Sequence, residues 1–514
     1  MSDWWGCGGI AGNEGTCNTS DAANAGLDQE QPNPTRYGPA LLAAVSTGTV
    51  SQVRLDDMVH RILRSLFASG LMDDPPAATG VDVNAGAAAA QQLAERSAVL
   101  LKNAGGVLPI DGSRTHRIAV LGAPANAAPA APEGCVIQQS GVLVLCSSAR
   151  VVAPAATDTP LLGLTDQAAG ADVTYDDGSD IVRAAQVAKD SDVAIVYARD
   201  TEAEGHDRAN LSLDGNADAL IAAVAAANPR TVVVLMTGSS VTMPWLSKVP
   251  AVLEAWYPGE RGGHAIARLL LGAVNPSGRL PLTFPASETD LPTAASPQQW
   301  PGDGTHIDYS EKLLIGYRWY DAKALRPLFP FGFGLSYGGH FEYSDIRITP
   351  ADDASQLAVR DGHIRATVDF TVTNTGAATA SETPQIYVGL PAAAGEPPGR
   401  LVAFSKVTLR PGESTVVRST ADDRALSYWN ADVHAWQLAA GCYRIRAGSS
   451  SRDLPLAGSI SVGAGKCGDA AGSSRARLPN TSGPGAPVSP AVWLIIFCPV
   501  CLLFAARLHC SRRS

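Results

Sequence analysis

The chain has 514 residues, of which 46% are hydrophobic and 17% are charged. A single hydrophobic core stops growing at about 250 to 300 residues, so one compact domain is excluded and two or more domains are expected. The 50 glycines and 35 prolines show no collagen-like period, which excludes fibrous and wholly disordered classes. The formal net charge of −10 has the wrong sign for a phosphate-binding surface and argues against nucleic acid as a partner.

Nine cysteines bear on the compartment in which the protein works. The first six form three pairs that are close in sequence, at positions 7 and 17, 135 and 146, and 442 and 467, and each pair can close a short disulfide loop. Free thiols in a reducing cell are the alternative, because spacing does not fix connectivity. Three sequons, which suit a secretory route, begin at Asn18, Asn210 and Asn480. An extracytoplasmic location is therefore expected.

The first half of the chain predicts an α/β domain. An apolar stripe at residues 50–71 predicts a helix that ends at Gly70, and residues 87–102 are again helical. Short apolar runs predict strands at 118–121, 193–197, 231–236 and 251–256, with helices at 181–188 and 216–227. Strands that alternate with helices predict a mostly parallel sheet.

The second half of the chain follows a different period. From Ile364 to Thr373 apolar and polar residues alternate strictly, which predicts a strand with one buried face. Further strands are predicted at 384–390, 414–420 and 442–447, with turn residues between them. This pattern predicts an all-β sandwich of about 100 residues.

The carboxyl end predicts a membrane anchor. Residues 491–506 carry no charge, so a transmembrane segment is expected at 488–508, with a cytoplasmic basic tail at 509–514 and a flexible linker at 464–487. A buried helix in a soluble domain is the alternative. The sequence LPNTS at 478–482 resembles a bacterial wall-sorting signal, with serine in place of its final glycine. Both anchoring modes would leave the folded domains outside the membrane, at the cell surface.

Two segments carry residues suited to catalysis. Asp3 lies beside Trp4 near the amino end, so a carboxylate there has an aromatic neighbour that can stack on a sugar ring. The second segment, 202–208, follows a predicted strand and contains Glu202 and Glu204 together with a histidine, an aspartate and an arginine. A solvated charged loop is the alternative for this segment. No metal-ligand spacing, phosphate-binding glycine loop or G-x-S-x-G motif is present.

Several motifs in fixed order resemble glycoside hydrolase family 3 enzymes of the β-glucosidase type. The motifs lie at residues 2–4, 22–30, 97–109, 204–213, 256–267, 275–281, 316–320 and 329–337. The resemblance implies a C-terminal remnant of a (β/α)8 barrel at 1–74, a linker at 75–95, an α/β sandwich domain at 96–290, a linker at 291–340 and a fibronectin type III-like domain at 341–463.

The resemblance also implies the roles of three residues. Asp3 matches the catalytic nucleophile, Trp4 an aromatic near the aglycone, and Glu204 the general acid/base. These roles suit retaining hydrolysis through a covalent glycosyl-enzyme, and neither a metal nor an organic cofactor is needed. Glu202 is a neighbour of Glu204 that can serve instead.

The chain departs from the family at its amino end, because a barrel of some 250 residues should precede the nucleophile and Asp3 is the third residue. No signal peptide is visible either, although an exported protein needs one. We therefore expect an N-terminally truncated form of a β-glucosidase acting on β-linked glucosides or oligosaccharides. A noncatalytic, surface-anchored glycan-binding module and a β-xylosidase are the alternatives. The sequence leaves the oligomeric state unknown.

Overall fold

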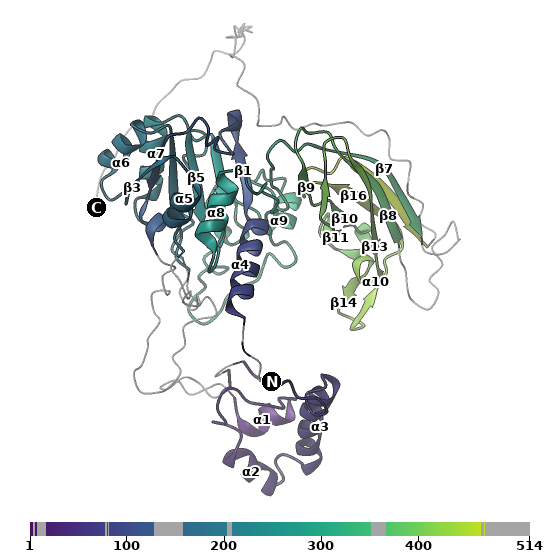
Figure 1. Ribbon diagram of the computed structural model, residues 1–514. Coiled ribbons are helices and arrows are strands. Elements are labelled where there is room, and N and C mark those ends of the chain that lie inside the picture. The colour runs from purple at the N-terminus through teal and green to yellow at the C-terminus, as the bar shows by residue number, and fades with distance from the viewer. Residues whose placement is uncertain are drawn as a thin grey trace, which may run out of the picture. The chain divides into compact units, whose positions relative to one another are not determined.

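The computed structural model describes residues 1–3, 6–7, 17–77, 80, 82–127, 158–202, 208–350, 366–463 and 467. The chain divides into two compact units, Met1–Val83 and Asn84–Ser514. The first unit contains three helices among its described residues, and the second contains an α/β domain and an all-β domain (Figure 1).

The first unit is built from α1 (Thr19–Asn24), α2 (Pro39–Ser46) and α3 (Gln52–Ala68). Asn18 caps α1 and Ser51 caps α3, because each side chain accepts hydrogen bonds from backbone N–H groups of the first turn. The small core of this unit consists of Ala23, Tyr37, Leu41, Ala44, Val50 and Met58. On α3 only Met58 is buried, and three residues of the predicted apolar stripe, Val59, Leu63 and Phe67, are exposed.

The predicted barrel remnant at residues 1–74 is corrected by this arrangement. Among the described residues of the first unit there are three helices and no β-strand. A barrel strand is stable only when strands on both sides satisfy its backbone N–H and C=O groups, and these 74 residues supply no such set of neighbours.

The α/β domain has a six-stranded sheet in the order β1-β6-β5-β4-β2-β3. The strands are β1 (Val99–Asn103), β2 (Arg117–Leu121), β3 (Asp172–Asp176), β4 (Val193–Arg199), β5 (Thr231–Met236) and β6 (Ala251–Glu254). Strands β2 to β6 are parallel, and β1 joins β6 in antiparallel orientation. The predicted mostly parallel sheet is confirmed.

Helices cover both faces of this sheet (Figure 1). Helices α6 (Ile181–Lys189) and α7 (Ala217–Ala227) pack on one face, whereas α5 (Pro160–Gln167) and α8 (Gly262–Leu270) pack on the other. The central strands β4 and β5 are buried on both faces, which is why they read as continuous apolar runs. Two further helices, α4 (Val83–Ser97) and α9 (Tyr317–Ala322), flank the domain in sequence.

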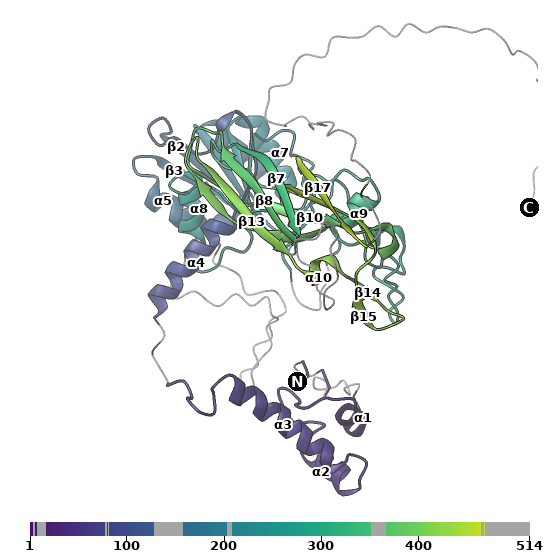
Figure 2. The ribbon, with the colours of Figure 1, turned by 90° about the vertical axis from the view of Figure 1, so that its right-hand side faces the viewer.

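The second domain is a β-sandwich. One sheet has the order β11-β10-β16-β17 and the other β13-β8-β7, with the small ladders β12-β9 and β14-β15 beside them. Figure 2 shows β13, β8 and β7 side by side. The strands and the short α10 are β7 (Phe341–Pro350), β8 (Ala366–Asn374), β9 (Ala380–Glu382), β10 (Gln385–Gly389), β11 (Arg400–Phe404), β12 (Val407–Leu409), β13 (Ser414–Ala421), α10 (Asp423–Leu426), β14 (Tyr428–Asn430), β15 (Ala435–Gln437), β16 (Gly441–Gly448) and β17 (Leu456–Val462). Burial alternates along the whole of β8, which confirms the predicted sandwich strand.

The fold class that ends in a transmembrane helix is also corrected. The longest helix that the structure describes, α3, has 17 residues and carries charges, and no helix among the described residues is long and apolar enough to cross a membrane. At about 1.5 Å per residue, 17 residues span less than the roughly 30 Å of a bilayer core. The predicted segment 488–508, the basic tail 509–514 and, apart from Cys467, the linker 464–487 lie outside the described residues. The membrane anchor is therefore without support.

Two of the three cysteine pairings are present as disulfides, Cys7–Cys17 and Cys442–Cys467. Cys135 and Cys146 lie outside the described residues.

Candidate functional site

Asp3, the predicted nucleophile, lies in a short segment whose backbone is fixed on both sides. The Ser2 N–H donates to the Gln29 carbonyl over 2.9 Å, and the Ser2 hydroxyl accepts from the Gln31 N–H over 2.9 Å. The Asp3 carbonyl accepts from the Gly6 N–H over 3.1 Å. Asp3 itself is exposed and lines an open cavity of about 450 Å³ within the first unit. Asp3 is therefore a solvent-exposed residue on a positioned backbone.

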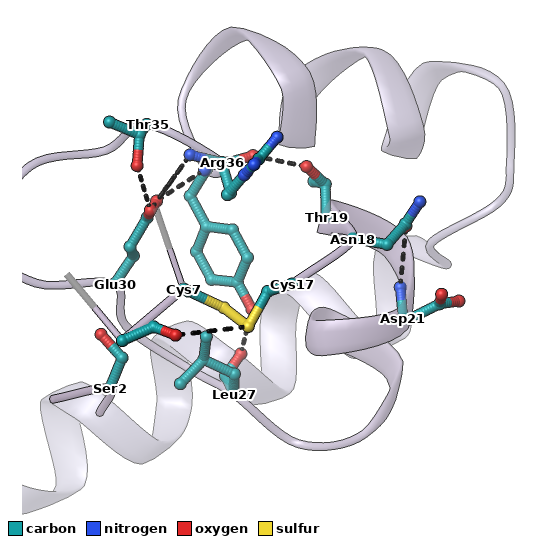
Figure 3. Close-up of a disulfide and its surroundings, with 12 residues drawn as sticks. Ser2, Cys7, Cys17, Asn18, Thr19, Asp21, Leu27, Glu30, Thr35 and Arg36 are labelled. Atoms are coloured by element: carbon teal, nitrogen blue, oxygen red, sulfur yellow. Dashed lines mark hydrogen bonds between the residues drawn. A yellow bond between two sulfur atoms is a disulfide. The ribbon is translucent and has the colours of Figure 1, made fainter. Parts of the chain in front are cut away.

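The Cys7–Cys17 disulfide lies beside this segment (Figure 3). Cys7 is 2% exposed, and both cysteines line the same cavity as Asp3. The disulfide thus closes the loop that follows the predicted nucleophile. Trp4, the predicted aromatic neighbour, lies outside the described residues.

Glu30 supports the other side of the segment. Its carboxylate accepts hydrogen bonds from the Thr35 hydroxyl over 2.6 Å and from the backbone N–H groups of Arg36 and Tyr37, over 2.9 Å and 2.8 Å (Figure 3). Burial raises the pKa of Glu30, but these hydrogen bonds outweigh it and hold the pKa below its ordinary value. Glu30 is an anchor for the 31–37 turn, since its oxygens are occupied by these donors.

A second candidate site lies in the α/β domain, at the edge where β4, β5 and β6 end. Parallel strands end at the same edge of a sheet, so the segments that directly follow them come together. Asp200 follows β4, Gly238 and Ser239 follow β5, and Tyr257 follows β6.

Asp200 is the buried centre of this edge. Its Oδ1 accepts hydrogen bonds from the Gly238 N–H over 3.0 Å and from the Tyr257 hydroxyl over 2.9 Å. Its Oδ2 lies 2.9 Å from Nη1 of Arg208, and the Asp200 side chain is fully buried in this ion pair. Burial raises the pKa of Asp200, and Gly238, Arg208 and Tyr257 act in the opposite direction.

Glu202 and Arg208 lie at the two ends of the predicted catalytic loop. Glu202 Oε1 accepts a 2.5 Å hydrogen bond from the Ser239 hydroxyl and lies 3.5 Å from Arg208 Nη1. Arg208 also donates to Ser239 Oγ over 2.9 Å and to the Ser212 carbonyl over 3.0 Å. Both ends of segment 203–207 are thereby tied to the sheet edge. Glu204, the predicted acid/base, lies between them and outside the described residues.

The close approach at this edge requires a glycine at position 238. A Cβ atom there would lie 2.5 Å from Glu202 Oε2 and 2.9 Å from Cε2 of Tyr257. Both distances are shorter than any unstrained contact, so a larger residue would displace the carboxylate or the ring.

Glu254, the last residue of β6, lies beneath the site and is 0% exposed. It accepts a hydrogen bond from the Trp256 N–H over 2.8 Å, and Thr237 Oγ1 lies 3.0 Å from Glu254 Oε2 and 3.0 Å from the Ser239 carbonyl. A hydroxyl has one proton, so a neutral Glu254 can donate to Thr237 while Thr237 donates to Ser239. Burial raises the pKa of Glu254 to about 8, which favours this neutral form.

Sequence reasoning identified the loop but missed most of the edge that holds it. Glu202 was considered as a catalytic alternative, but its carboxylate is bound by Ser239 and Arg208. Asp200 and Tyr257 were not singled out for chemistry, although both directly follow predicted buried strands, where site residues of α/β sheets gather. No group of histidine, cysteine and carboxylate side chains able to hold a metal ion is found in the part of the chain that the structure describes.

Two family models match the second unit. The model described as the glycosyl hydrolase family 3 C-terminal domain matches residues 98–337. The model described as a fibronectin type III-like domain matches residues 382–451.

Curated proteins and solved structures extend the likeness over most of the chain. The thermostable beta-glucosidase B of Acetivibrio thermocellus is 37% identical over 461 residues, which cover 85% of this chain and 56% of that protein. An exo-alpha-(1->6)-L-arabinopyranosidase of Bifidobacterium breve is 32% identical and aligns with 88% of this chain and 59% of its own length. The crystal structure of DesR, a β-glucosidase from Streptomyces venezuelae in complex with D-glucose, has a TM-score of 0.75 and 30% identity, with 87% of this chain and 71% of that chain covered. The chain thus spans somewhat more than half the length of these two curated relatives.

Proposed function

The chain belongs to glycoside hydrolase family 3, and from this membership we propose that the protein is a retaining β-glucosidase that releases terminal nonreducing β-D-glucose from short β-linked glucosides. Two of the relatives described above carry the name β-glucosidase: the Acetivibrio thermocellus protein, found by sequence similarity, and DesR, found by structural similarity. The observation that carries the proposal is that both ends of segment 203–207, which contains Glu204, are tied to the sheet edge by Glu202 and Arg208.

The proposed mechanism has two displacements. The Asp3 carboxylate attacks the anomeric carbon while Glu204 donates its proton to the leaving glycosidic oxygen, which gives a covalent glycosyl-enzyme and a free alcohol. Glu204 then takes a proton from water as the water oxygen attacks the anomeric carbon, and glucose leaves with its original configuration. Trp4 is proposed to stack on the aglycone.

The sheet edge supports the acid/base role in a specific way. Glu204 has to carry a proton before the first step, and a neighbouring carboxylate favours the protonated form of an acid. Glu202 is two residues from Glu204 in the sequence, and its own position is fixed by Ser239. Arg208 forms its shorter ion pair with the fully buried Asp200, at 2.9 Å, and lies 3.5 Å from Glu202.

The test is hydrolysis of an aryl β-D-glucopyranoside by the protein that contains this chain. Asp3→Ala and Glu204→Ala should each lower kcat by about 10²- to 10⁴-fold. The exposed Asp73 and Glu413 provide matched controls, and Asp73→Ala and Glu413→Ala should retain activity. With a dinitrophenyl glucoside, added azide should restore turnover in Glu204→Ala and yield β-glucosyl azide, because the small anion needs no general base.

Several outcomes would contradict the proposal. Full activity in both Asp3→Ala and Glu204→Ala would show that other residues carry out the reaction. An α-glucosyl azide from Glu204→Ala would be inconsistent with a double displacement. Saturable binding of glucosides by the wild-type protein, with no turnover of any of them, would instead identify a noncatalytic glycan-binding module.

A second substrate class is favoured by one comparison. The similar Bifidobacterium breve protein is named an exo-alpha-(1->6)-L-arabinopyranosidase, and its identity to this chain is 32%. Aryl α-L-arabinopyranosides and aryl β-D-xylosides are therefore included in the same assay. A kcat/KM for either that exceeds the value for the glucoside would reassign the specificity and leave the proposed mechanism in place.

We further propose that the protein is located outside the cytoplasm. The Cys7–Cys17 and Cys442–Cys467 disulfides are stable in an oxidising compartment, which supports the location. Non-reducing mass spectrometry of the secreted protein should recover both disulfides, and free thiols at these four cysteines would contradict the location.

We also propose two domain limits in the second unit. The proposed domains are residues 96–290 and 341–463, connected by residues 291–340.

A further inference from the structure

A cavity of about 360 Å³ lies within the second unit, and Asp200, Glu202 and Arg208 are not among the residues that line it. It is formed where the end of α4 and the loop after α8 meet the turn between β11 and β12. Its principal lining side chains are Arg96, Trp256, Ser277, Arg279, Phe404 and Lys406. The α/β domain and the β-sandwich both contribute to this lining.

The cavity collects positive charge. Of its three cations only Arg279 has a carboxylate partner among the described residues, Glu382, at 2.8 Å. Lys406 Nζ donates to the Ser277 hydroxyl over 2.7 Å and lies 3.4 Å from the Arg96 carbonyl. Neither Lys406 nor Arg96 forms a salt bridge within the part of the chain that the structure describes.

Burial and the neighbouring cations destabilise the charged form of Lys406. Desolvation first, and then the charges of Arg279 and Arg96, lower the pKa of Lys406 to about 8. Each cation therefore disfavours the charged form of Lys406, and Glu382 is already bound by Arg279. The attraction of an anion in the cavity would offset both the cost of desolvation and the mutual repulsion of the cations.

Two aromatic side chains complete the lining. The Trp256 indole is partly buried and donates through Nε1 to the Ser97 carbonyl over 3.1 Å, which fixes its ring. The Phe404 side chain is 67% exposed. Aromatic faces beside polar groups bind compounds that have an apolar ring face and a polar rim, as pyranose sugars do.

We propose that this cavity is a binding site for a monosaccharide-sized ligand that carries an oxyanion, either a phosphate or a carboxylate. Lys406 and Arg96 would bind the oxyanion, and Trp256 and Phe404 would bind the ring. The site is separate from the proposed hydrolytic site and does not depend on that activity.

The test is isothermal titration of the full protein with four probes: glucose 6-phosphate, glucuronate, inorganic phosphate and glucose. Glucose 6-phosphate or glucuronate should bind saturably, and the tighter of the two identifies the oxyanion. Lys406→Met should weaken that binding about 10-fold or more, since it removes a charge-assisted hydrogen bond. Lys189→Met, a change at an exposed lysine on α6, should leave it unchanged. Phe404→Ala tests the ring contact and should weaken binding of the sugar acid but not of inorganic phosphate.

The proposal is overturned if no anionic probe binds, if inorganic phosphate binds as tightly as glucose 6-phosphate and glucuronate, or if Lys406→Met binds like wild type. Thermal unfolding of each variant establishes that it folds. Should Lys406→Met fail to fold, Arg96→Met is the substitute, because Arg96 is exposed at the end of α4. Binding that persists in that variant would count equally against the site.

Discussion

Replacement of Glu254 by glutamine tests whether the buried carboxyl at the base of the sheet edge is neutral. Glutamine has nearly the same shape, has no charge at any pH, and its amide can donate to Thr237 as the protonated acid does. In the wild type, burial raises the pKa of Glu254 from 4.5 to about 8. The two proteins should therefore differ in how their stability depends on pH.

The direction and size of the change in unfolding free energy with pH follow from proton linkage. Below pH 4.5 both the folded and the unfolded states hold the Glu254 proton, so this residue adds no pH dependence. Between pH 4.5 and 8 only the folded state keeps it, and each pH unit lowers the free energy of unfolding by about 1.4 kcal/mol. Over the 3.5 pH units of this interval the loss is about 5 kcal/mol at most, and above pH 8 it levels off.

The measurement is denaturant unfolding of wild type and Glu254→Gln at pH 5, 6, 7 and 8, followed by tryptophan fluorescence. The unfolding free energy of Glu254→Gln minus that of wild type should rise steadily with pH across this range. Glu413→Gln, at an exposed carboxylate in the β-sandwich, is the control and should show no such trend. A constant difference between wild type and Glu254→Gln would refute the reasoning, because it would mean that Glu254 titrates alike in both states.

Three further predictions concern packing, charge and cross-linking. Gly238→Ala should displace the carboxylate and the tyrosine ring beside it and reduce glucoside turnover, with kcat affected more than KM, whereas the unfolding free energy should fall by only about 1 kcal/mol because both displaced groups are side-chain ends. Arg279→Met should cost about 3–5 kcal/mol in denaturant unfolding because it leaves the buried Glu382 carboxylate without its ion-pair partner, and the additional change Glu382→Gln should restore much of that loss. Removal of the Cys7–Cys17 disulfide by serine at both positions should lower the stability of the first unit by about 3 kcal/mol, measured by its protease resistance, and an unchanged digestion rate would contradict this.

The interior of the fold was predictable because burial leaves a local signature. The predicted strand at 231–236 coincides with β5, and the alternation found near residue 370 marks β8. Strand β1 was missed, and its residues were assigned to the end of the preceding helix. Its partner β6 lies some 150 residues further along the chain, so nothing local to Val99–Asn103 indicates the pairing.

The candidate site was predictable only in part, for a related reason. The charged loop stood out by composition, whereas Asp200, Ser239 and Tyr257 belong to segments that meet only because three parallel strands end together. Isolated polar residues after apolar runs are common in any sequence. The catalytic roles of Asp3, Trp4 and Glu204 remain predictions.

The backbone after β6 takes an unusual conformation at Trp256. Trp256 has a φ of 57°, which is rare for a residue with a bulky side chain and costs about 1–3 kcal/mol. The conformation is held by two hydrogen bonds, from the Trp256 N–H to Glu254 and from its indole to the Ser97 carbonyl. Because the chain turns at this point, the Tyr257 hydroxyl reaches Asp200 while the Trp256 indole lines the cationic cavity. Two adjacent residues therefore contribute to the two proposed sites, Tyr257 to the Asp200 edge and Trp256 to the cationic cavity.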